Sequence, residues 1–131
     1  MGFSRPKKEE IIYEDIHVYA CLARFPLSPG HVVVVWKKDV KDLHLLSRKE
    51  YVHLMNVVDS VRDALLKTLK LKKVYLLYLD EANHVHWHLI PRYHQKGFTV
   101  LTHHPRVLKD FSLAERIRED LCMKKRSKRA L

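Results

Sequence analysis

The chain has little cysteine, little glycine and no long apolar run. Of its 131 residues only two are cysteine, Cys21 and Cys122, and neither belongs to a C-x-x-C or other metal-type spacing. No stretch approaches the run of about 18 uncharged apolar residues that a membrane-spanning helix needs. Residues 1–10 are polar and charged, unlike the apolar core of a secretory signal. The sequence therefore predicts a reduced, cytoplasmic protein with no membrane partner.

Positive charge is in excess. Lys and Arg total 25 against 15 Asp and Glu, which gives a formal net charge of +10. Five of the basic residues fall within residues 124–131, so residues 1–123 are near +5, which is 10 minus 5. We predict one domain over residues 1–123 and a disordered basic tail over residues 124–131. A basic domain suits an anionic substrate such as a phosphate ester, although a solvated basic surface is an equal alternative.

Apolar and β-branched runs predict the strands. The run of residues 32–36 is apolar throughout, as in a strand that is buried on both faces. Neither Gly nor Pro occurs between Gly30 and Pro91, which indicates long uninterrupted elements there. The predicted extended segments cover residues 13–24, 32–36, 74–79 and 84–90.

Two segments carry helix signals. Ser47 opens an S-x-x-E capping box, and apolar residues then recur at every third or fourth position over residues 47–70. A second S-x-x-E box at Ser112 opens a predicted C-terminal helix over residues 112–123. The order strand, strand, helix, strand, strand, helix predicts an α+β domain with a mainly antiparallel sheet.

The most informative segment reads HVHWHLI and covers residues 84–90. Alternate side chains of a strand point to opposite faces, so the imidazoles of His84, His86 and His88 share one face and apolar side chains occupy the other. The apolar side can supply core, which leaves the histidines at a polar or solvent-accessible site. Three interpretations follow: a metal site, solvated surface histidines, or nucleophilic catalysis.

A metal site needs imidazoles that converge on one point. The Cα atoms of His84 and His88 lie about 13 Å apart on a straight strand, at roughly 3.3 Å per residue, which makes a site with all three histidines marginal. Two of them could still bind zinc together with His31, and an exposed row of surface histidines is a further alternative. Catalysis on phosphorus fits better, because a neutral imidazole is a nucleophile whose neighbours can hydrogen-bond phosphoryl oxygens.

Two segments together resemble one protein family. Residues 84–90 are similar to the His-φ-His-φ-His-φ-φ motif of the histidine triad (HIT) family of nucleotide hydrolases and transferases, where φ is apolar. Residues 26–35, PLSPGHVVVV, resemble the family's P-x-x-P-G-H loop and the strand after it. The resemblance extends over roughly residues 10–95. It implies a HIT-like α+β fold with a mainly antiparallel five-stranded sheet, one long central helix and a C-terminal helix, paired with its copy in a homodimer.

The resemblance also implies a role for each matched histidine. His86 would be the nucleophile that attacks the α-phosphate and forms a nucleotidyl-imidazole. His88 would bind a phosphoryl oxygen or the leaving group. His84 and His31 would form a buried hydrogen-bond relay that orients His86. No metal and no cofactor takes part in the chemistry that the resemblance implies.

Three further side chains are candidates for substrate binding: Lys37 and Arg92 for phosphate, and His94 because it follows the triad strand. Three segments depart from the family pattern. Ala23 stands where many members have a ribose-binding aspartate, residues 79–81 read Leu-Asp-Glu where many have Gly-Gln-Ser, and residues 36–39 read Trp-Lys-Lys-Asp where Pro-Lys-x-His is usual. The carboxylate of Glu81, at the position of the serine, would repel a phosphate unless it is protonated or turned away. These departures bear on nucleoside recognition more than on the histidine chemistry.

These features predict a hydrolase or nucleotidyltransferase that cleaves nucleoside 5′-phosphate derivatives through a covalent nucleotidyl-histidine. The substrate would be a small nucleotide, either a dinucleoside polyphosphate or a nucleoside phosphoramidate. The basic tail makes nucleic acid a further candidate partner. The alternative is a non-catalytic nucleotide- or RNA-binding module on the same scaffold. The sequence does not specify the nucleoside, the leaving group or the role of residues 96–106.

Overall fold

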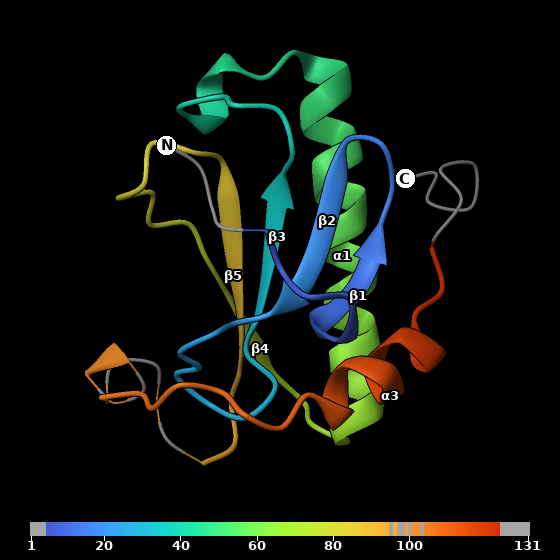
Figure 1. Cartoon of the computed structure of the whole chain (residues 1–131), viewed down its shortest axis with the longest axis vertical. Coiled ribbons are helices and arrows are strands. Elements are labelled where there is room, and N and C mark those ends of the chain that lie inside the picture. Colours follow the sequence, from blue (N-terminus) through green and yellow to red (C-terminus); the bar gives the residue numbers. More distant parts are fainter. Residues whose placement is uncertain (1–4, 95, 97–98, 100, 103, 124–131) are drawn as a thin grey trace.

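The structure is a computed structural model that describes residues 5–94, 96, 99, 101–102 and 104–123 (Figure 1). Its strands form one sheet in the order β1-β2-β3-β5-β4, and every neighbouring pair is antiparallel. The predicted α+β fold, with a five-stranded sheet, a long helix and a C-terminal helix, is confirmed. The predicted basic tail lies outside the described residues. The elements are η1 (Lys8–Glu10), β1 (Ile11–Glu14), β2 (Val18–Leu22), β3 (Val32–Trp36), η2 (Leu43–Leu45), α1 (Arg48–Leu69), β4 (Val74–Leu77), β5 (His86–Pro91) and α3 (Ser112–Asp120).

The segment predicted as one extended stretch, residues 13–24, is a hairpin of β1 and β2. Asp15 makes the turn, because one oxygen of its carboxylate accepts hydrogen bonds from the N–H groups of His17 and Val18, each at 2.7 Å. A short acidic side chain that bonds the main chain two and three residues later is a common way to form such a turn. Residues 13–24 contain neither Gly nor Pro, so the sequence pattern alone did not reveal this turn.

α1 begins where the sequence signal places it. The hydroxyl of Ser47 accepts a hydrogen bond from the Glu50 N–H (3.1 Å), and the Glu50 carboxylate accepts one from the Ser47 N–H (2.8 Å). The predicted capping box is therefore confirmed. Lys70 ends the helix in a left-handed conformation with φ 55°.

α3 begins at residue 112 as predicted, although Ser112 is the first helical residue and Phe111 is the cap. The carboxylate of Asp110 accepts a hydrogen bond from the Ser112 N–H (3.0 Å). The helix ends at Asp120, before the predicted end near residue 123. The hydroxyl of Thr68 donates to the Asp120 carboxylate (2.7 Å), which holds the end of α3 against α1.

The side chains of the sheet divide between two faces. Alternate residues of β3 join the main core, whereas Val33 and Val35 between them belong to a smaller buried cluster. In the register of β3 with β5, these two valines lie opposite His88 and His86. Residues that face each other in an antiparallel pair share one side of the sheet. We call the side that carries these four residues the histidine face, and the other side the core face.

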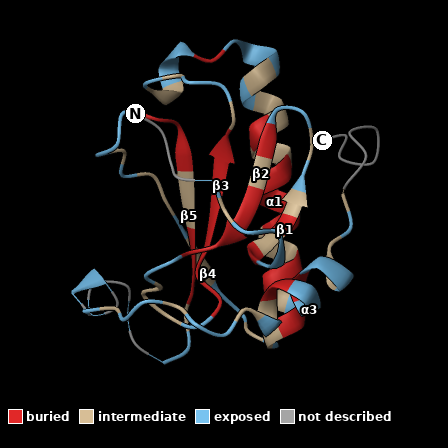
Figure 2. Cartoon of the chain, viewed as in Figure 1, coloured by how far each residue is buried: buried red, intermediate tan, exposed pale blue. Residues whose placement is uncertain are grey.

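The two helices cover the core face. α1 runs behind the sheet in Figure 1, and its sheet-facing residues are buried in Figure 2. Leu65 of α1, Ile117 of α3 and Leu89 of β5 are each 0% exposed in this core. Residues 5–10 cross the opposite, histidine face, where Pro6 lines a cleft (Figure 1). Within the described chain, no helix is long and apolar enough to cross a membrane.

Candidate active site

His31 and His88 meet through the pairing of β3 with β5. His31 immediately precedes β3, and His88 lies opposite Val33 in the antiparallel register. The two histidines are 57 positions apart in the sequence, yet Nε2 of His31 lies 2.9 Å from Nδ1 of His88. Their rings meet edge to face, with centroids 5.1 Å apart. The fold thus joins the two segments on which the family resemblance depends.

A main-chain amide determines which nitrogen of each ring carries the proton. The N–H of Leu27 donates to Nδ1 of His31 (3.0 Å), so the neutral His31 ring carries its proton on Nε2. That Nε2–H donates to Nδ1 of His88, whose own proton must then lie on Nε2. His88 therefore offers an N–H donor at its outer nitrogen.

Burial favours the same neutral forms. Burial, followed by the charge of His88, lowers the pKa of His31 to about 3. Burial also lowers the pKa of His88 to about 4, with the charge of His86 as the second cause. Both rings are uncharged at neutral pH, in agreement with their hydrogen bonds.

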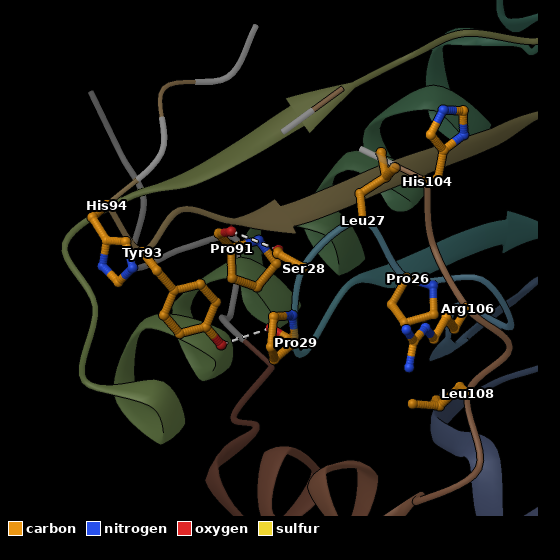
Figure 3. A pocket seen from close by; sticks show the side chains of 10 residues that line it. All are labelled: Pro26, Leu27, Ser28, Pro29, Pro91, Tyr93, His94, His104, Arg106 and Leu108. Carbon is orange, nitrogen blue, oxygen red and sulfur yellow. Dashed lines mark hydrogen bonds between the residues drawn. The ribbon is translucent and has the colours of Figure 1, made fainter. Parts of the chain in front are cut away.

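The loop that supplies the Leu27 amide is anchored on both sides. The hydroxyl of Ser28 donates to the carbonyl of Pro91 (2.7 Å), and the hydroxyl of Tyr93 donates to the carbonyl of Pro29 (2.7 Å) (Figure 3). These bonds connect the loop before β3 to the chain after β5. They hold the Leu27 N–H in position toward the histidine pair.

His86 lies beside this pair with a ring nitrogen suited to attack. Its Nδ1 lies 2.8 Å from the carbonyl oxygen of His84. A carbonyl only accepts, so Nδ1 carries the proton of the neutral ring and Nε2 carries the lone pair. The rings of His86 and His88 meet edge to face with centroids 4.9 Å apart. A ring that carries a lone pair on Nε2 thus lies next to a ring that carries an N–H donor.

His84 is buried, as predicted, beside the end of β3. It precedes β5, and its Nε2 lies 2.6 Å from the carbonyl oxygen of Trp36 at the end of β3. His31, the other residue of the predicted relay, bonds to His88, and the role of both residues in orienting His86 stays a prediction. His84 contacts His86 through its main-chain carbonyl, which lies 2.8 Å from Nδ1 of His86. The strand register decides these partners, and the spacing of histidines along the sequence does not reveal it.

Asp80 is a residue that the sequence analysis did not assign to the site. Its side chain is 4% exposed, and its Oδ1 accepts hydrogen bonds from the N–H groups of Ala82 and His84, each at 3.1 Å. The same oxygen lies 4.0 Å from Nδ1 of His86. The carboxylate of Asp80 thus lies toward Nδ1 of His86, whereas Glu81, the predicted source of repulsion, is exposed. The sequence offered a signal for this contact, because an aspartate at the start of a short turn before a strand often accepts hydrogen bonds from the next main-chain amides.

A cleft of about 280 Å³ opens beside the histidine pair. Two charged side chains, Glu10 and Arg24, border it, and Glu10 is only 6% exposed. A concave site with an apolar floor and few polar groups is typical of small-molecule binding. We call it the histidine cleft. Its floor is formed by Tyr19, Cys21, Ala23, Val33 and Val35.

The three predicted substrate-binding side chains lie elsewhere. Lys37, at the end of β3, pairs with Glu14 at 2.6 Å. Arg92 follows β5, where its main-chain N–H donates to the Lys73 carbonyl (3.0 Å). His94 lines a second cavity, of about 800 Å³, beside the loop before β3 (Figure 3). Among the residues that the structure describes, none of the three lines the histidine cleft, and their role in binding stays a prediction.

A zinc site formed by two of the triad histidines and His31 would require side chains that converge on one point. Among the described residues, no group of three or more His, Cys, Asp or Glu side chains is arranged to hold a metal ion. The nearest nitrogens of His31 and His88 are instead joined by a hydrogen bond to each other.

A five-stranded α+β domain with clustered histidines on one sheet face defines a histidine triad protein. The family model for the HIT domain matches residues 4–95. An uncharacterized HIT-like protein of Methanocaldococcus jannaschii is 33% identical over 99 residues, which cover 70% of this chain and 74% of that protein. The chain therefore belongs to the HIT domain family.

Solved structures share the fold. A HIT-like protein of Bartonella henselae, described as involved in cell-cycle regulation, has a TM-score of 0.71 at 24% identity, over 85% of this chain and 86% of that chain. The diadenosine triphosphate hydrolase of Plasmodium falciparum has a TM-score of 0.67 at 18% identity, over 90% of this chain and 77% of that chain. At such identities the likeness shows a common fold.

Proposed function

We propose that the chain is a HIT hydrolase or nucleotidyltransferase that acts on nucleoside 5′-phosphate derivatives through a covalent bond to His86. The observation that carries the proposal is the bond from Nδ1–H of His86 to the His84 carbonyl, which leaves the lone pair on Nε2. His88 supplies an N–H donor next to it. A neutral nucleophile beside a hydrogen-bond donor is what attack on a phosphate requires. The shared fold with a diadenosine triphosphate hydrolase supports this substrate class.

In the first step, Nε2 of His86 attacks the α-phosphorus and forms a P–N bond. The bond from phosphorus to the leaving group breaks, and its electron pair departs with the leaving group. The Nε2–H of His88 donates to a phosphoryl oxygen and stabilises the charge that gathers there. Nδ1 of His86 keeps its proton, so the phosphorylated ring becomes a cation.

Asp80 is proposed to stabilise that cation. Its buried carboxylate lies 4.0 Å from Nδ1 of His86, where the positive charge forms. An opposite charge at this distance favours the charged state of the ring. Hydrogen bonds from the N–H groups of Ala82 and His84 hold the carboxylate in place.

In the second step, an oxygen nucleophile attacks the same phosphorus. The P–N bond breaks, its electron pair returns to Nε2 of His86, and the proton of the attacking oxygen passes to solvent. Water would yield a nucleoside 5′-monophosphate, and an acceptor hydroxyl would yield a transfer product.

The nucleoside is proposed to lie in the histidine cleft. The apolar floor suits one face of a base or sugar. Glu10 offers a buried carboxylate that can accept hydrogen bonds from hydroxyl or amino groups. Ala23 offers no polar group, so recognition of the sugar would depend on other residues of the cleft.

The proposal includes a homodimer. β4 is an edge strand of the sheet, and Leu76 and Leu79 near its end are exposed. An edge strand with exposed apolar side chains is a template for pairing with another chain. Sedimentation equilibrium is expected to give twice 15.6 kDa. A monomer mass would contradict this part of the proposal.

The activity is tested by incubating the protein with diadenosine triphosphate and EDTA and following AMP release by chromatography. The control variant is His86→Asn, whose amide can still donate to the His84 carbonyl but lacks Nε2. We expect the wild type to release AMP at least about 1,000-fold faster than the variant. Equal rates would contradict the role of His86. Nucleotide binding without AMP release would indicate the non-catalytic binding module instead.

A further inference from the structure

We propose that the second cavity, beside the loop before β3, binds a small organic phosphate: Arg106 holds the phosphate, and proline rings contact its apolar body. We call it the loop cavity, and its lining includes Pro26, Pro29, Tyr93 and Arg106 (Figure 3). This binding site is separate from the histidine cleft and does not depend on the proposed function of His86.

The loop cavity is a site of its own. Among the described residues, those that line it and those that line the histidine cleft do not overlap. Leu27 lies between the two sites, because its N–H donates to Nδ1 of His31 while its side chain lines the loop cavity. The volume of about 800 Å³ falls within the range of about 300–1,000 Å³ that is common for small-molecule sites. The loop cavity is therefore large enough for a ligand that the histidines do not touch.

The walls of the loop cavity are held in place without a ligand. The hydroxyl of Ser28 donates to the Pro91 carbonyl, and the hydroxyl of Tyr93 donates to the Pro29 carbonyl, each at 2.7 Å. Both bonds join the loop to the chain that follows β5, and the proline rings fix the main-chain φ angle. A preformed site loses little conformational entropy when a ligand binds, which favours affinity.

The charged groups of the lining are basic. Arg106 lies there together with the imidazoles of His94 and His104, and the described lining contains no Asp or Glu. No carboxylate of the described residues pairs with Arg106, whereas Lys37 on the sheet pairs with Glu14 at 2.6 Å. The guanidinium N–H donors are therefore available to an anion.

The position of Arg106 favours a phosphate. The N–H of Leu108, two residues later, donates to the Arg24 carbonyl at 2.6 Å, which holds this segment against the chain after β2. A guanidinium presents its donors in a planar fork that matches two phosphate oxygens at once. Imidazoles of the lining can add further N–H donors. The chemistry of the site thus selects an oxyanion with more than one acceptor oxygen.

The rest of the lining selects an apolar body. In Figure 3, Pro26 lies next to Arg106, and Pro29 and Tyr93 lie between Arg106 on one side and His94 on the other. The proline rings and the phenol ring offer flat apolar surfaces, which suit a flat aromatic group. A bare inorganic anion would leave this surface in contact with water. The ligand class that uses both parts of the lining is an aryl phosphate or a similar organic phosphate.

Titration calorimetry with phenylphosphonate tests the site in the full chain, because the P–C bond of this phosphate analogue is not hydrolysed. The matched variants are Arg106→Gln in the loop cavity and Arg24→Gln at the histidine cleft. We expect Kd to rise at least about tenfold in Arg106→Gln, as for the loss of a charge-assisted hydrogen bond, and less than about twofold in Arg24→Gln.

Three outcomes of this titration would overturn the proposal. The wild type could fail to bind phenylphosphonate, or Arg106→Gln could bind it as tightly as the wild type. An equal loss in both variants would show that the anion responds only to the net charge of the protein.

A comparison with inorganic phosphate tests the apolar part of the site. We expect phenylphosphonate to bind at least about tenfold more tightly, because its ring leaves water for the surface of the prolines and Tyr93. Equal affinities would overturn the assignment of an organic phosphate.

Amide NMR during the titration locates the ligand without turnover. We expect the largest shifts of amide resonances at Leu27, Tyr93 and Leu108, which line the loop cavity, and smaller shifts at Tyr19 and Val33 of the histidine cleft. Larger shifts at Tyr19 and Val33 would place the ligand in the histidine cleft and overturn the proposal. Absence of AMP release from diadenosine triphosphate would contradict the role of His86 and leave this binding site unaffected.

Discussion

The two faces of the sheet hold their side chains in different ways. On the core face, Leu89 is 0% exposed and packs in the cluster that both helices complete. On the histidine face, its neighbour His88 accepts a hydrogen bond from His31, which is held in turn by the Leu27 amide. The core depends on apolar area and volume, whereas the site depends on the direction of a few polar contacts. Substitutions at adjacent residues of β5 should therefore have different effects: one should lower the free energy of unfolding, and the other should lower kcat.

Leu89→Ala tests the core face and has the largest expected effect. Loss of a fully buried leucine leaves a cavity between sheet and helices, so the free energy of unfolding should fall by about 2–5 kcal/mol. The value of kcat per folded molecule should stay near that of the wild type, because His86 and His88 are held from the other face. Urea unfolding and steady-state kinetics measure the two quantities. A kcat that falls while the protein is fully folded would show that the histidine site also depends on packing of the core face.

His88→Asn tests the adjacent position on the histidine face. The asparagine keeps an oxygen that can accept from His31, but it lacks Nε2. We expect kcat for diadenosine triphosphate to fall about 100-fold, or about 2.7 kcal/mol in activation free energy, with KM nearly constant. The free energy of unfolding should change by less than about 1 kcal/mol. An unchanged kcat would show that the outer nitrogen of His88 does not reach the phosphate.

The buried histidines should make the free energy of unfolding depend on pH. The folded pKa values of His31 and His88, about 3 and about 4, lie below the ordinary value of 6.5. The unfolded chain thus binds more protons between about pH 6.5 and about pH 4, and the free energy of unfolding falls as the pH drops. Each histidine contributes up to about 1.4 kcal/mol per pH unit in that window. Urea unfolding at several pH values should show a shallower slope in His31→Gln, and identical slopes would contradict the buried neutral state.

Asp80→Asn has the smallest expected effect. The amide has nearly the same shape and its oxygen can still accept from the His84 N–H, but the charge near His86 is gone. We expect kcat to fall about tenfold, or about 1.4 kcal/mol, at constant KM. The control is Tyr78→Phe, which removes one hydrogen bond to the Asp80 carboxylate and keeps its charge. Equal losses in the two variants would mean that Asp80 only shapes the turn.

Features that lie within one segment could be predicted from the sequence. The apolar run of β3, the capping box at Ser47 and the alternation around His86 and His88 are each local patterns, and the structure contains all three. His31 was identified through a motif resemblance, and the fold brings it next to the triad. Local patterns and linked motifs therefore predicted the architecture and the central histidines.

Contacts that depend on main-chain atoms or strand register could not be predicted in the same way. The Asp15 turn, the Leu27 amide on His31 and the direction of the Asp80 carboxylate each need the three-dimensional path of the chain. The partner of His31 is His88 and not His84, because the register of β3 with β5 decides which rings meet. The hydrogen-bond partners at this site are thus determined by the three-dimensional path of the chain, which the sequence pattern does not reveal.

The histidine face is proposed to react through a covalent bond at His86. This bond can be detected by rapid mixing with diadenosine triphosphate, quenching in base and intact-mass analysis. We predict a transient mass increase of one adenylyl group on the wild type, located on the peptide that contains His86, and none on His86→Asn. Turnover at the wild-type rate with no adduct, or an adduct on another residue, would contradict the account.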